Sequence, residues 1–474
     1  MIGRMRFAAW WMVSPSGIAL SPGYGCGVLA DLRALVGDDH VVASPDPALL
    51  ADASAYAGVT GSAAALVRPG SAQEVAAVVS WCAQRGVPVV PRGGGTGFSG
   101  GCVPQDPASV VVAVDRLDAV RSLDVLQWRA HVEAGVTTAR LARLARENGL
   151  RFPVDPGAAE QSHIGGNIAT NAGGPHCFKH GVTRAWVLGV EAVLGNGELV
   201  TVGGPTRKDV AGYDLAGLLC GSEGTLGIIT AAWMRLIPAP PVEIAIAAVL
   251  PDARAGQEAL DAVLGSGVVP AVVEFLDAGA VAAAAGSFPG GALSPDAGFV
   301  LIVEVDTSPQ DADEVVAALR SAGATVSQPS PGALWRWRDG VSIAVAAVHG
   351  GKLSEDIAVP VERLAEAVER TVEIGARHGL QACSWGHAGD GNLHSTFLLD
   401  PADAAQRARA DDAAADLFAM ALELGGTVSG EHGLGLLKNG WLSKQWSPAA
   451  VAAADAVRRA LDPAGIMNPA TKRP

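Results

Sequence analysis

The sequence predicts an α+β protein built from two domains, and three observations support this. The chain has 474 residues, more than the roughly 250 to 300 at which a single hydrophobic core stops growing. Apolar residues make up 49% of it but aromatic residues only 5%, with 59 glycines, which is typical of short strands alternating with alanine-rich helices. The proline-rich stretch IPAPPVE, residues 237 to 243, separates two regions of different pattern, so we place the domain boundary near residue 240.

Charge, cysteine content and hydropathy exclude several classes of protein. The net charge of -14, with no basic cluster, argues against binding to nucleic acids or anionic membranes. The six cysteines are scattered, without the spacing of a zinc site or the density of a disulfide scaffold. No apolar run reaches the ~18 residues of a transmembrane helix. We therefore expect a cytoplasmic enzyme with no nucleic-acid partner and no transmembrane segment.

Residues 1 to 39 are expected to form an extension outside the folded domains. The run FAAWWMV follows two arginines there but is at the lower limit for a signal peptide, and no clear cleavage site follows. A disordered extension or an upstream start codon is therefore favoured over a signal peptide.

Strand and helix patterns then follow in order. The segment ALVRPGSAQEVAAVVSWCAQRGVPVVPRGGG predicts strand, turn, helix and strand, with Ser71 and Glu74 forming a capping box. VVVAVDRL, HVEAGV, VEAVLGNGELV and GIITAAWMRLIP predict further strands, and the Asn-Gly pair in the third indicates a hairpin. Residues 241 to 440 alternate strands such as IAIAAVL with helices such as PQDADEVVAALRSAG, and residues 441 to 474 return to helix before the turn LDPAGIMNP.

Three loops between these strands are rich in glycine: PRGGGTGFSGG (91–101), DPGAAEQSHIGGNIATNAGG (155–174) and GYDLAGLLCGSEGTLGIIT (212–230). The first lacks the Lys-Ser/Thr of a Walker loop and opens no obvious helix as a Rossmann fingerprint requires. Consecutive glycines nevertheless let backbone N–H groups converge on an anion without obstruction by Cβ atoms. Any one such loop could equally be a tight turn, but three together favour a long dinucleotide ligand.

Two histidines in CSWGHAGDGNLHSTF, residues 383 to 397, flank a turn of glycine and small polar residues. The turn can bring His387 and His394 to one point, and downstream SGEHGLG places Glu431 beside His432. Two imidazoles and a carboxylate suit Zn²⁺ or a similar divalent ion. The spacing is neither HExxH nor a zinc finger, so from spacing alone loop histidines satisfied by backbone carbonyls are the leading interpretation.

Together these motifs resemble the signatures of the vanillyl-alcohol-oxidase superfamily, with its PCMH-type FAD domain. Within it the chain is similar to the D-lactate, glycolate and D-2-hydroxyglutarate dehydrogenase branch, from about residue 40 to the C-terminus and with the motifs in family order. The resemblance implies a two-subdomain FAD-binding domain at residues 40 to 240 and an α/β cap with a metal site at 241 to 440. Residues 441 to 474 would return to the flavin domain.

The resemblance further implies that FAD is bound, noncovalently, by the three loops and the C-terminal turn. The flavin pyrophosphate would rest on residues 92 to 96. His176, Cys177, His180 and Cys102 are the candidates by position if the flavin were attached covalently. The implied cofactor-binding residues are Pro91, Arg92, Gly93, Gly94, Gly95, Thr96, Gly97, Pro156, Gly157, Ile164, Gly165, Gly166, Asn171, Gly173, Gly174, Ser222, Glu223, Gly224, Thr225, Gly227, Ile228 and Asn468.

In the resembled enzymes the two histidine motifs form the metal and active site. This carries over to His387, His394 and Glu431 as ligands of Zn²⁺ or another divalent metal, and to His432 as catalytic base. The implied reaction oxidises a 2-hydroxy acid to the 2-oxo acid with hydride transfer to flavin. An arginine fork suits the substrate carboxylate, and the family register, a Trp followed three residues later by Arg, selects Arg338.

Two alternatives to that assignment concern the substrate pocket. Arg336, two residues before Arg338 in LWRWRDG, is left as a solvated or structural charge. Related 2-hydroxyglutarate enzymes carry a lysine where this chain has Ser354, although Lys352 lies two residues earlier. If that lysine binds a distal carboxylate, its loss favours a monocarboxylic over a dicarboxylic substrate.

Competing functions stay open from sequence alone. A metal-dependent hydrolase would use the histidines to activate water, with the glycine loops as turns. A flavin electron-transfer subunit would carry no substrate oxidation of its own. The expected partners are a small 2-hydroxy acid and an electron acceptor, which is a quinone, an electron-transfer protein or oxygen, and a homodimer is compatible with the sequence.

Overall fold

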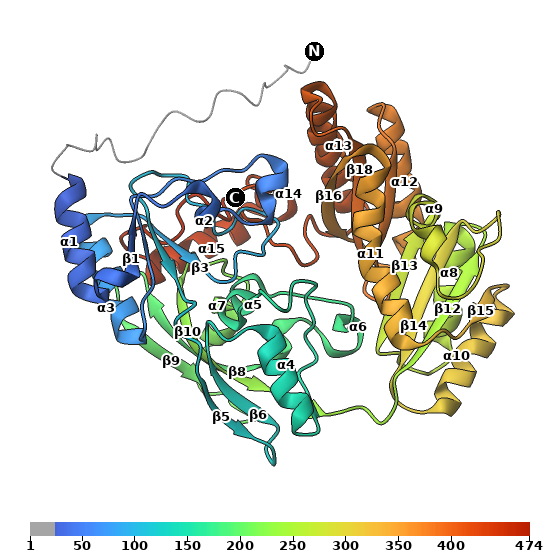
Figure 1. Cartoon of the computed structure of the whole chain (residues 1–474), viewed down its shortest axis with the longest axis horizontal. Helices are drawn as coiled ribbons and strands as arrows, with labels where there is room; N and C mark the ends of the chain where they lie inside the picture. The colour runs from blue at the N-terminus through green and yellow to red at the C-terminus, as the bar shows by residue number, and fades with distance from the viewer. Residues whose placement is uncertain (1–23) are drawn as a thin grey trace.

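The computed structural model describes residues 24–474, which form two bodies around separate hydrophobic cores (Figure 1). We call residues 24–238 together with 448–474 the first domain, and residues 244–446 the cap. The boundary between the two cores lies between β11 (Ile237–Pro238) and β12 (Ile244–Leu250), within the proline-rich segment. Within the described part of the chain, no helix is long and apolar enough to cross a membrane.

The first domain contains two main sheets. A four-stranded sheet has the order β1-β2-β4-β3, in which β4 runs parallel to both neighbours, and is made of β1 (Val41–Ala43), β2 (Ala65–Val67), β4 (Val110–Ala113) and β3 (Val89–Arg92). An antiparallel five-stranded sheet has the order β5-β6-β10-β8-β9, made of β5 (Val120–Asp124), β6 (Arg129–Glu133), β10 (Gly227–Arg235), β8 (Val187–Leu194) and β9 (Leu199–Gly203). The predicted Asn-Gly hairpin is confirmed by the pairing of β8 with β9. A short pair joins β11 to β7 (Leu150–Arg151).

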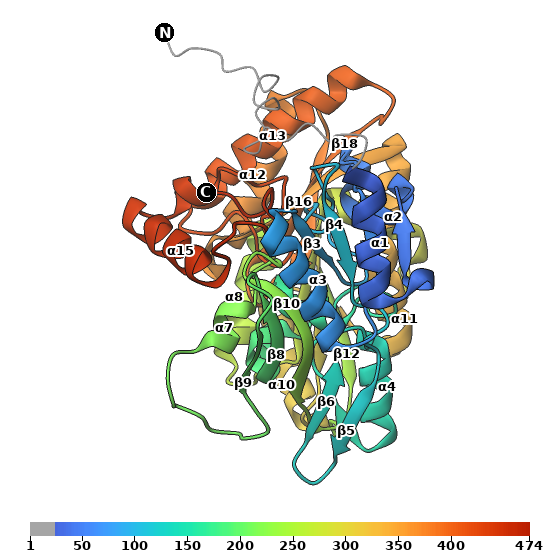
Figure 2. The same ribbon diagram turned by 90° about the vertical axis from the view of Figure 1, so that its left-hand side faces the viewer.

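Helices surround these sheets, beginning with α1. Val28, Leu32 and Val36 of this helix are buried in the domain core, and Figure 2 shows α1 beside α3. Part of the segment expected to be an extension, residues 1 to 39, therefore belongs to the folded domain, and residues 1–23 lie outside the described residues. The helices are α1 (Tyr24–Val36), α2 (Pro47–Leu50), α3 (Ala72–Arg85), α4 (Thr138–Glu147), α5 (Ile164–Thr170), α6 (Cys177–His180), α7 (Leu215–Leu219) and α15 (Pro448–Leu461).

The predicted cap of α3 forms in a modified way. Ser71 Oγ accepts the backbone N–H of Glu74 at 3.1 Å, as a capping box requires. The Glu74 carboxylate, however, accepts from the backbone N–H of Gly70 at 2.8 Å. The reciprocal bond is thus made one residue further upstream than expected.

The cap is a seven-stranded sheet, antiparallel throughout, with the order β15-β12-β14-β13-β17-β18-β16. Four helices and the larger core cover one face, and two helices and a smaller core cover part of the other. The strands not yet given are β13 (Val272–Asp277), β14 (Phe299–Val305), β15 (Thr325–Ser327), β16 (Gly351–Ala358), β17 (Ala382–His387) and β18 (Asn392–Leu399). The first face carries α8 (Ala253–Gly265), α10 (Pro309–Ser321), α12 (Leu364–Arg377) and α13 (Ala404–Glu423), the second carries α9 (Ala278–Ala284) and α11 (Pro331–His349), and α14 (Leu442–Gln445) follows.

Alternation along the cap strands sends polar side chains to the second face. On β13, Val273 and Phe275 enter the larger core, so Glu274 between them points the other way. On β18, Leu393 likewise enters that core and His394 does not. On this second face Glu274 accepts from Arg338 and Glu304 accepts from Trp335, both on α11.

The last residues of the chain return to the first domain. Met467 forms a parallel bridge to Val89 of β3, and the backbone N–H of Val89 donates to Ile466 O at 2.9 Å. Figure 1 accordingly places the C-terminus over the first domain.

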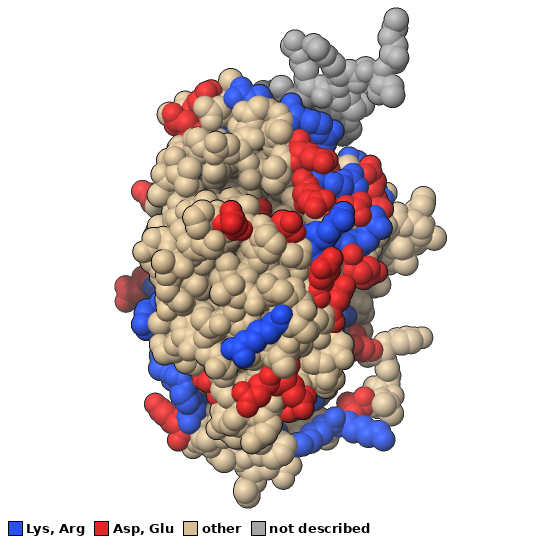
Figure 3. All heavy atoms as spheres, turned by 90° about the vertical axis from the view of Figure 1, so that its right-hand side faces the viewer, with Lys and Arg blue, Asp and Glu red and all other residues tan. Residues whose placement is uncertain are grey.

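The opposite side of the molecule, formed by the cap, has a largely uncharged centre, and its basic side chains are interspersed with acidic ones along the edge (Figure 3).

Candidate active site

Two histidines and a glutamate from separate segments of the cap converge on one point. His387 ends β17 and His394 lies near the start of β18. The turn between them needs glycine at position 391, where φ is +73° and a Cβ would lie 2.1 Å from the Val359 carbonyl oxygen. Glu431 Oε1, from the loop after α13, lies 3.7 Å from Nε2 of His387 and 3.5 Å from Nε2 of His394. One ligand atom from each of the three residues lies within 4.8 Å of the other two.

This donor set suits a divalent metal ion such as Zn²⁺. Burial lowers the pKa of His394 to about 3, so its imidazole is neutral and its Nε2 lone pair is available. Burial works to raise the pKa of Glu431, but the neighbouring histidines, His387 foremost, lower it to about 2. Two imidazole nitrogens and one carboxylate oxygen leave coordination positions open for a substrate.

The buried side chain of Glu274 contacts the cluster through His387. Glu274 is 0% exposed and pairs with Nδ1 of His387, which leaves Nε2 directed at Glu431. The same carboxylate accepts from Nε of Arg338 at 2.6 Å. Burial works to raise the pKa of Glu274, but Arg338 and His387 hold it below its ordinary value. Carboxylates of this kind orient metal-binding histidines, and the sequence interpretation did not include this one.

Arg338, the predicted substrate clamp, lies close to the cluster on α11. Its Nε and one terminal nitrogen face Glu274. That terminal nitrogen, Nη2, is buried and makes no hydrogen bond of ordinary geometry within residues 24–474. Arg336 is on the exposed side of the same helix. The arrangement therefore leaves Arg338 able to offer an N–H toward the cluster, while Glu274 fixes its orientation.

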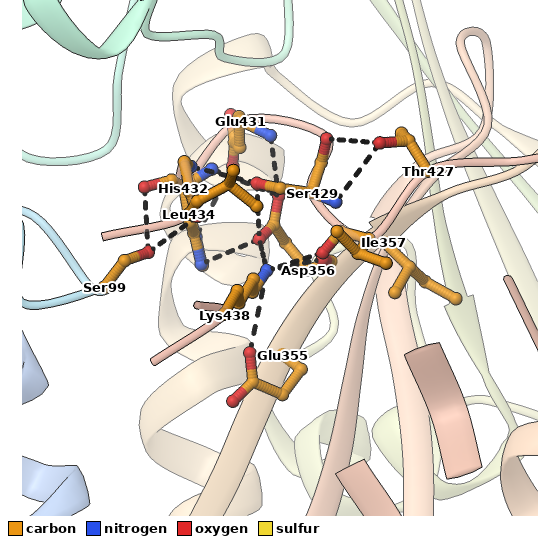
Figure 4. Close-up of polar contacts among 12 residues, drawn as sticks. Ser99, Glu355, Asp356, Ile357, Thr427, Ser429, Glu431, His432, Leu434 and Lys438 are labelled. Carbon is orange, nitrogen blue, oxygen red and sulfur yellow. Dashed lines mark hydrogen bonds and ion pairs between the residues drawn. The ribbon is translucent and has the colours of Figure 1, made fainter. Parts of the chain in front are cut away.

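His432 lies beside the cluster with its two ring nitrogens in different surroundings (Figure 4). Its Nδ1 is 3.4 Å from Oδ1 of the fully buried Asp356, and its Nε2 is 3.9 Å from Oε1 of Glu431. The ring stacks on Phe98 of the first domain, with centroids 4.6 Å apart. Ser99 Oγ donates to the His432 backbone carbonyl at 2.9 Å. The predicted base is thus held at the seam between the two domains.

The first and second glycine loops meet backbone to backbone. A Cβ on Gly93 would lie 3.3 Å from Cα of Gly166, and one on Gly94 would lie 2.0 Å from the Gln161 carbonyl oxygen. Within residues 24–474, the backbone N–H groups of residues 93–97 have no acceptor. Free N–H groups in a loop without Cβ atoms fit the diphosphate of a dinucleotide. The Arg92 side chain turns away, toward Ala51 O at 2.7 Å, and supports the loop.

The third glycine loop joins the other two. A Cβ on Gly224 would lie 2.8 Å from Cγ of Pro91, and the backbone N–H of Glu223 donates to Ala169 O at 2.7 Å. The Glu223 side chain instead accepts the backbone N–H groups of Leu434 and Gly435, at 3.0 and 2.7 Å. This predicted cofactor residue thus fastens the loop that carries Glu431 and His432 to the first domain.

The other predicted cofactor residues fall into three groups. Asn468 lies against the first and third glycine loops, where its amide donates to the carbonyls of Gly101 and Glu223 at 2.6 and 2.8 Å. The side chains of Ile164 and Ile228 are buried in the core, so only their backbones could contact a cofactor. The remaining positions stay in or beside the converging loops: Gly95, Thr96, Gly97, Pro156, Gly157, Gly165, Asn171, Gly173, Gly174, Ser222, Thr225 and Gly227.

The segment around α6 docks the first domain onto the cap. His176 Nε2 lies 3.0 Å from Oε1 of Glu304 on β14, and its Nδ1 lies 2.5 Å from Asp155. Burial and Arg151, which contacts Nε2, work to lower the pKa of His176, but Asp155 and Glu304 outweigh them and raise the pKa to about 9. Lys179 pairs with Asp306 of the cap. A cationic histidine between two carboxylates therefore contributes to the domain contact.

Three of the four candidates for covalent flavin attachment are engaged elsewhere or unreactive, whereas Nε2 of His180 is buried without a hydrogen-bond partner within residues 24–474. Both ring nitrogens of His176 face carboxylates. Burial raises the pKa of Cys102 to about 12 and that of Cys177 above the usual range of a thiol. Thiols in such surroundings are poor nucleophiles. These observations argue against attachment of the flavin through His176, Cys102 or Cys177.

The second face also places Ser354 and Lys352 relative to the cluster of His387, His394 and Glu431. In the register of β16 with β18, Asp356 lies opposite His394 and Ser354 opposite Thr396, with Lys352 one pair further away. Ser354 Oγ is 2.8 Å from Oγ1 of Thr396. Lys352 donates to Ser342 Oγ at 2.6 Å, and burial lowers its pKa to about 8. Position 354, which is nearer the cluster than position 352, thus carries a hydrogen-bonded hydroxyl and no cation.

Comparison with known proteins decides the family. Residues 63–203 match the family described as FAD binding domain, and residues 239–471 match the FAD linked oxidases, C-terminal domain. The glycolate oxidase subunit GlcD of Bacillus subtilis is 34% identical over 414 residues, covering 85% of this chain and 88% of the relative. The chain belongs to the FAD-linked oxidase family.

Other relatives of this FAD-linked oxidase have similar identity. D-2-hydroxyglutarate dehydrogenase of Xanthomonas citri pv. viticola is 33% identical, covering 85% of this chain and 88% of its own. D-lactate dehydrogenase of Archaeoglobus fulgidus is 32% identical, covering 85% and 90%. The solved 4-ethylphenol oxidase from Gulosibacter chungangensis shares the fold with a TM-score of 0.75 at 19% identity, covering 95% of this chain and 97% of its own.

The family assignment confirms the predicted fold class, FAD as cofactor and an FAD-dependent oxidoreductase. The hydrolase alternative required the glycine loops to be simple turns, so it loses its basis in this FAD-linked oxidase. The sequence interpretation missed Glu274 and Asp356. The available signal was a charged residue within an apolar strand, as in VVEFLD, because a buried charge needs a partner.

Proposed function

We propose that this FAD-linked oxidase oxidises a small 2-hydroxy acid to the corresponding 2-oxo acid. The observation that carries the proposal is the convergence of His387, His394 and Glu431 beside His432, at the seam between the cap and the glycine loops. Relatives named for glycolate, D-lactate and D-2-hydroxyglutarate, which are all 2-hydroxy acids, support this substrate class.

The proposed reaction removes the hydroxyl proton and the hydrogen on C2. His387, His394 and Glu431 would hold a divalent metal ion, which would supply the positive charge that lowers the pKa of the substrate hydroxyl group. His432 accepts the hydroxyl proton at Nε2, the nitrogen that faces the cluster, while Asp356 faces Nδ1. FAD supplies the acceptor for the hydride that leaves C2. The substrate thus loses two electrons and two hydrogens in total.

Arg338 binds the substrate carboxylate in this proposal. Glu274 holds part of its guanidinium, at 2.6 Å from Nε, and so fixes the direction of its remaining N–H groups. Fixed N–H donors lose little conformational freedom when an anion binds. Ser354 supplies a neutral, paired hydroxyl further along the strand, which favours glycolate, lactate or a larger monocarboxylic hydroxy acid over a dicarboxylate.

Anaerobic bleaching of the bound flavin tests the proposal. A panel of D- and L-2-hydroxy acids is added to the FAD- and Zn²⁺-loaded protein, and absorbance near 450 nm is followed. We expect one enantiomeric series to bleach the flavin, and we expect a chelator or His387→Ala to abolish bleaching while FAD stays bound. His349→Ala, at the exposed end of α11, is the matched control and should bleach normally.

The outcomes separate the alternatives. Bleaching at full rate in metal-free protein would refute the metal role, and no bleaching by any hydroxy acid would favour an electron-transfer subunit. Adding oxygen, a soluble quinone or an electron-transfer flavoprotein to the reduced protein then identifies the class of electron acceptor from the rate at which absorbance returns.

A further inference from the structure

A fully buried lysine lies under the predicted base. Lys438 is 1% exposed, in the segment that follows Glu431 and His432. Its ammonium donates to the Asp356 backbone carbonyl at 2.9 Å, to Oδ1 of the same residue at 2.5 Å and to the Val428 carbonyl at 2.9 Å. An ammonium has three N–H donors, and all three are used. Lys438 therefore has no donor left for a substrate or cofactor, and its partners define its role.

Its main partner, Asp356, holds the active-site loop. One carboxylate oxygen accepts the backbone N–H of Glu431 at 2.6 Å and that of His432 at 3.1 Å, while the other faces Nδ1 of His432 at 3.4 Å and Lys438. Ser429 Oγ also donates to this carboxylate, at 3.2 Å (Figure 4). The backbone of the metal-binding glutamate and the ring of the predicted base thus depend on one side chain.

The Lys438 ammonium limits the positions that this side chain can take. It donates hydrogen bonds to both the backbone carbonyl and the carboxylate of Asp356. Rotation of the carboxylate would therefore break its hydrogen bond to the buried ammonium. With the carboxylate in place, the favourable tautomer of His432 carries its proton on Nδ1. Its Nε2 then presents a lone pair toward the cluster, as a proton acceptor needs.

We propose that Lys438 is a positioning residue of this active site: through Asp356 it sets the tautomer and direction of His432. This inference rests on the proposed role of His432 as base. The neighbouring Glu355 carboxylate, 3.7 Å from the ammonium, is a second counter-charge. The centroid of the Phe418 ring lies 5.2 Å from the Lys438 ammonium.

Stopped-flow reduction of the FAD- and Zn²⁺-loaded protein tests this role. Lys438→Met keeps the length of the side chain and removes its charge. We expect the limiting rate of flavin reduction to fall about 10- to 100-fold, as for other residues that orient an active-site group, with FAD content and half-saturating substrate concentration nearly unchanged. Lys438→Arg should recover part of the rate. Lys444→Met, on the exposed side of α14, is the control and should match the wild type.

A measurement on the wild type keeps the proposal testable even if Lys438→Met does not fold. In protein labelled with ¹⁵N-histidine, with His432→Asn used to assign the signal, His432 should carry its proton on Nδ1. A proton on Nε2, or a limiting rate for Lys438→Met within about threefold of the wild type, would overturn the proposal. If no 2-hydroxy acid reduces the wild-type flavin, the proposed function fails, while the tautomer still decides the positioning role.

Discussion

Glu274→Gln isolates the contribution of a single buried carboxylate to the proposed metal site. The glutamine keeps the size and shape of the side chain but removes the charge that faces both His387 and Arg338. Glu274 is 0% exposed and the Arg338 side chain is 14% exposed, so water cannot replace the lost partner. We expect weaker metal binding and lower stability, with FAD still bound because the glycine loops are untouched.

The expected magnitudes follow from these contacts. Removing the carboxylate that orients a metal-binding histidine costs about 10- to 100-fold in metal affinity, or about 1.4 to 2.7 kcal/mol. Leaving Arg338 without its counter-charge costs about 3 to 5 kcal/mol in the free energy of unfolding. The amide of glutamine can still accept one hydrogen bond, so the lower end of this range applies.

Two assays measure these losses separately. Competition with a chromophoric chelator gives the Zn²⁺ affinity, and denaturant unfolding of the FAD-loaded protein gives the stability. Glu243→Gln is the matched control, because that side chain is 55% exposed and only 3.5 Å from Arg151, so its effect should be below about 1 kcal/mol. Zn²⁺ affinity of Glu274→Gln within about twofold of the wild type would refute the reasoning.

Three further predictions concern the cofactor loop, the domain contact and the substrate. Gly94→Ala would place a Cβ 2.0 Å from the Gln161 carbonyl oxygen, so the purified variant should lack most of its 450 nm absorbance; full FAD content would contradict this. The pKa of His176 is about 9 in the folded protein, above the ordinary 6.5, so its contribution is present below pH 6.5 and about 3 kcal/mol is lost as the pH rises through 9. His176→Gln should therefore remove most of the fall in unfolding free energy between pH 7 and 10, and an equal fall in the variant would count against the Glu304 contact. Ser354→Lys should lower the half-saturating concentration of a dicarboxylic 2-hydroxy acid relative to a monocarboxylic one, and no change in that ratio would reject position 354 as a determinant of specificity.

The sequence predicted the parts of the site that lie in short, compositionally unusual segments. The turn between His387 and His394 and the three glycine loops could be recognised because glycine and polar residues are concentrated there. Spacing alone left the histidines as ordinary loop residues, and the family resemblance supplied the pairing with Glu431. The structure places these residues together by pairing β17 with β18 and folding the loop after α13 against them.

The residues that sequence analysis missed contact partners that are far away in the sequence. Glu274 meets His387 after 113 residues, and Lys438 meets Asp356 after 82. Neither pair forms a local motif. The first depends on the pairing of β13 with β17, and the second on the packing of the segment after α13 against β16. The α1 helix is a further case, because its three core residues at positions 28, 32 and 36 follow a region whose composition resembles an extension.

The turn at residues 466–468 links the cofactor site to the timing of protein synthesis. Asn468 joins the Gly101 and Glu223 carbonyls, and Met467 pairs with Val89, although residues 93 to 465 intervene between this turn and β3. At ~5 to 20 residues per second, a ribosome needs roughly 20 to 75 s to translate that interval. The proposed cofactor site therefore stays incomplete while the whole cap is being made, and we expect stable FAD binding only after this turn has left the ribosome.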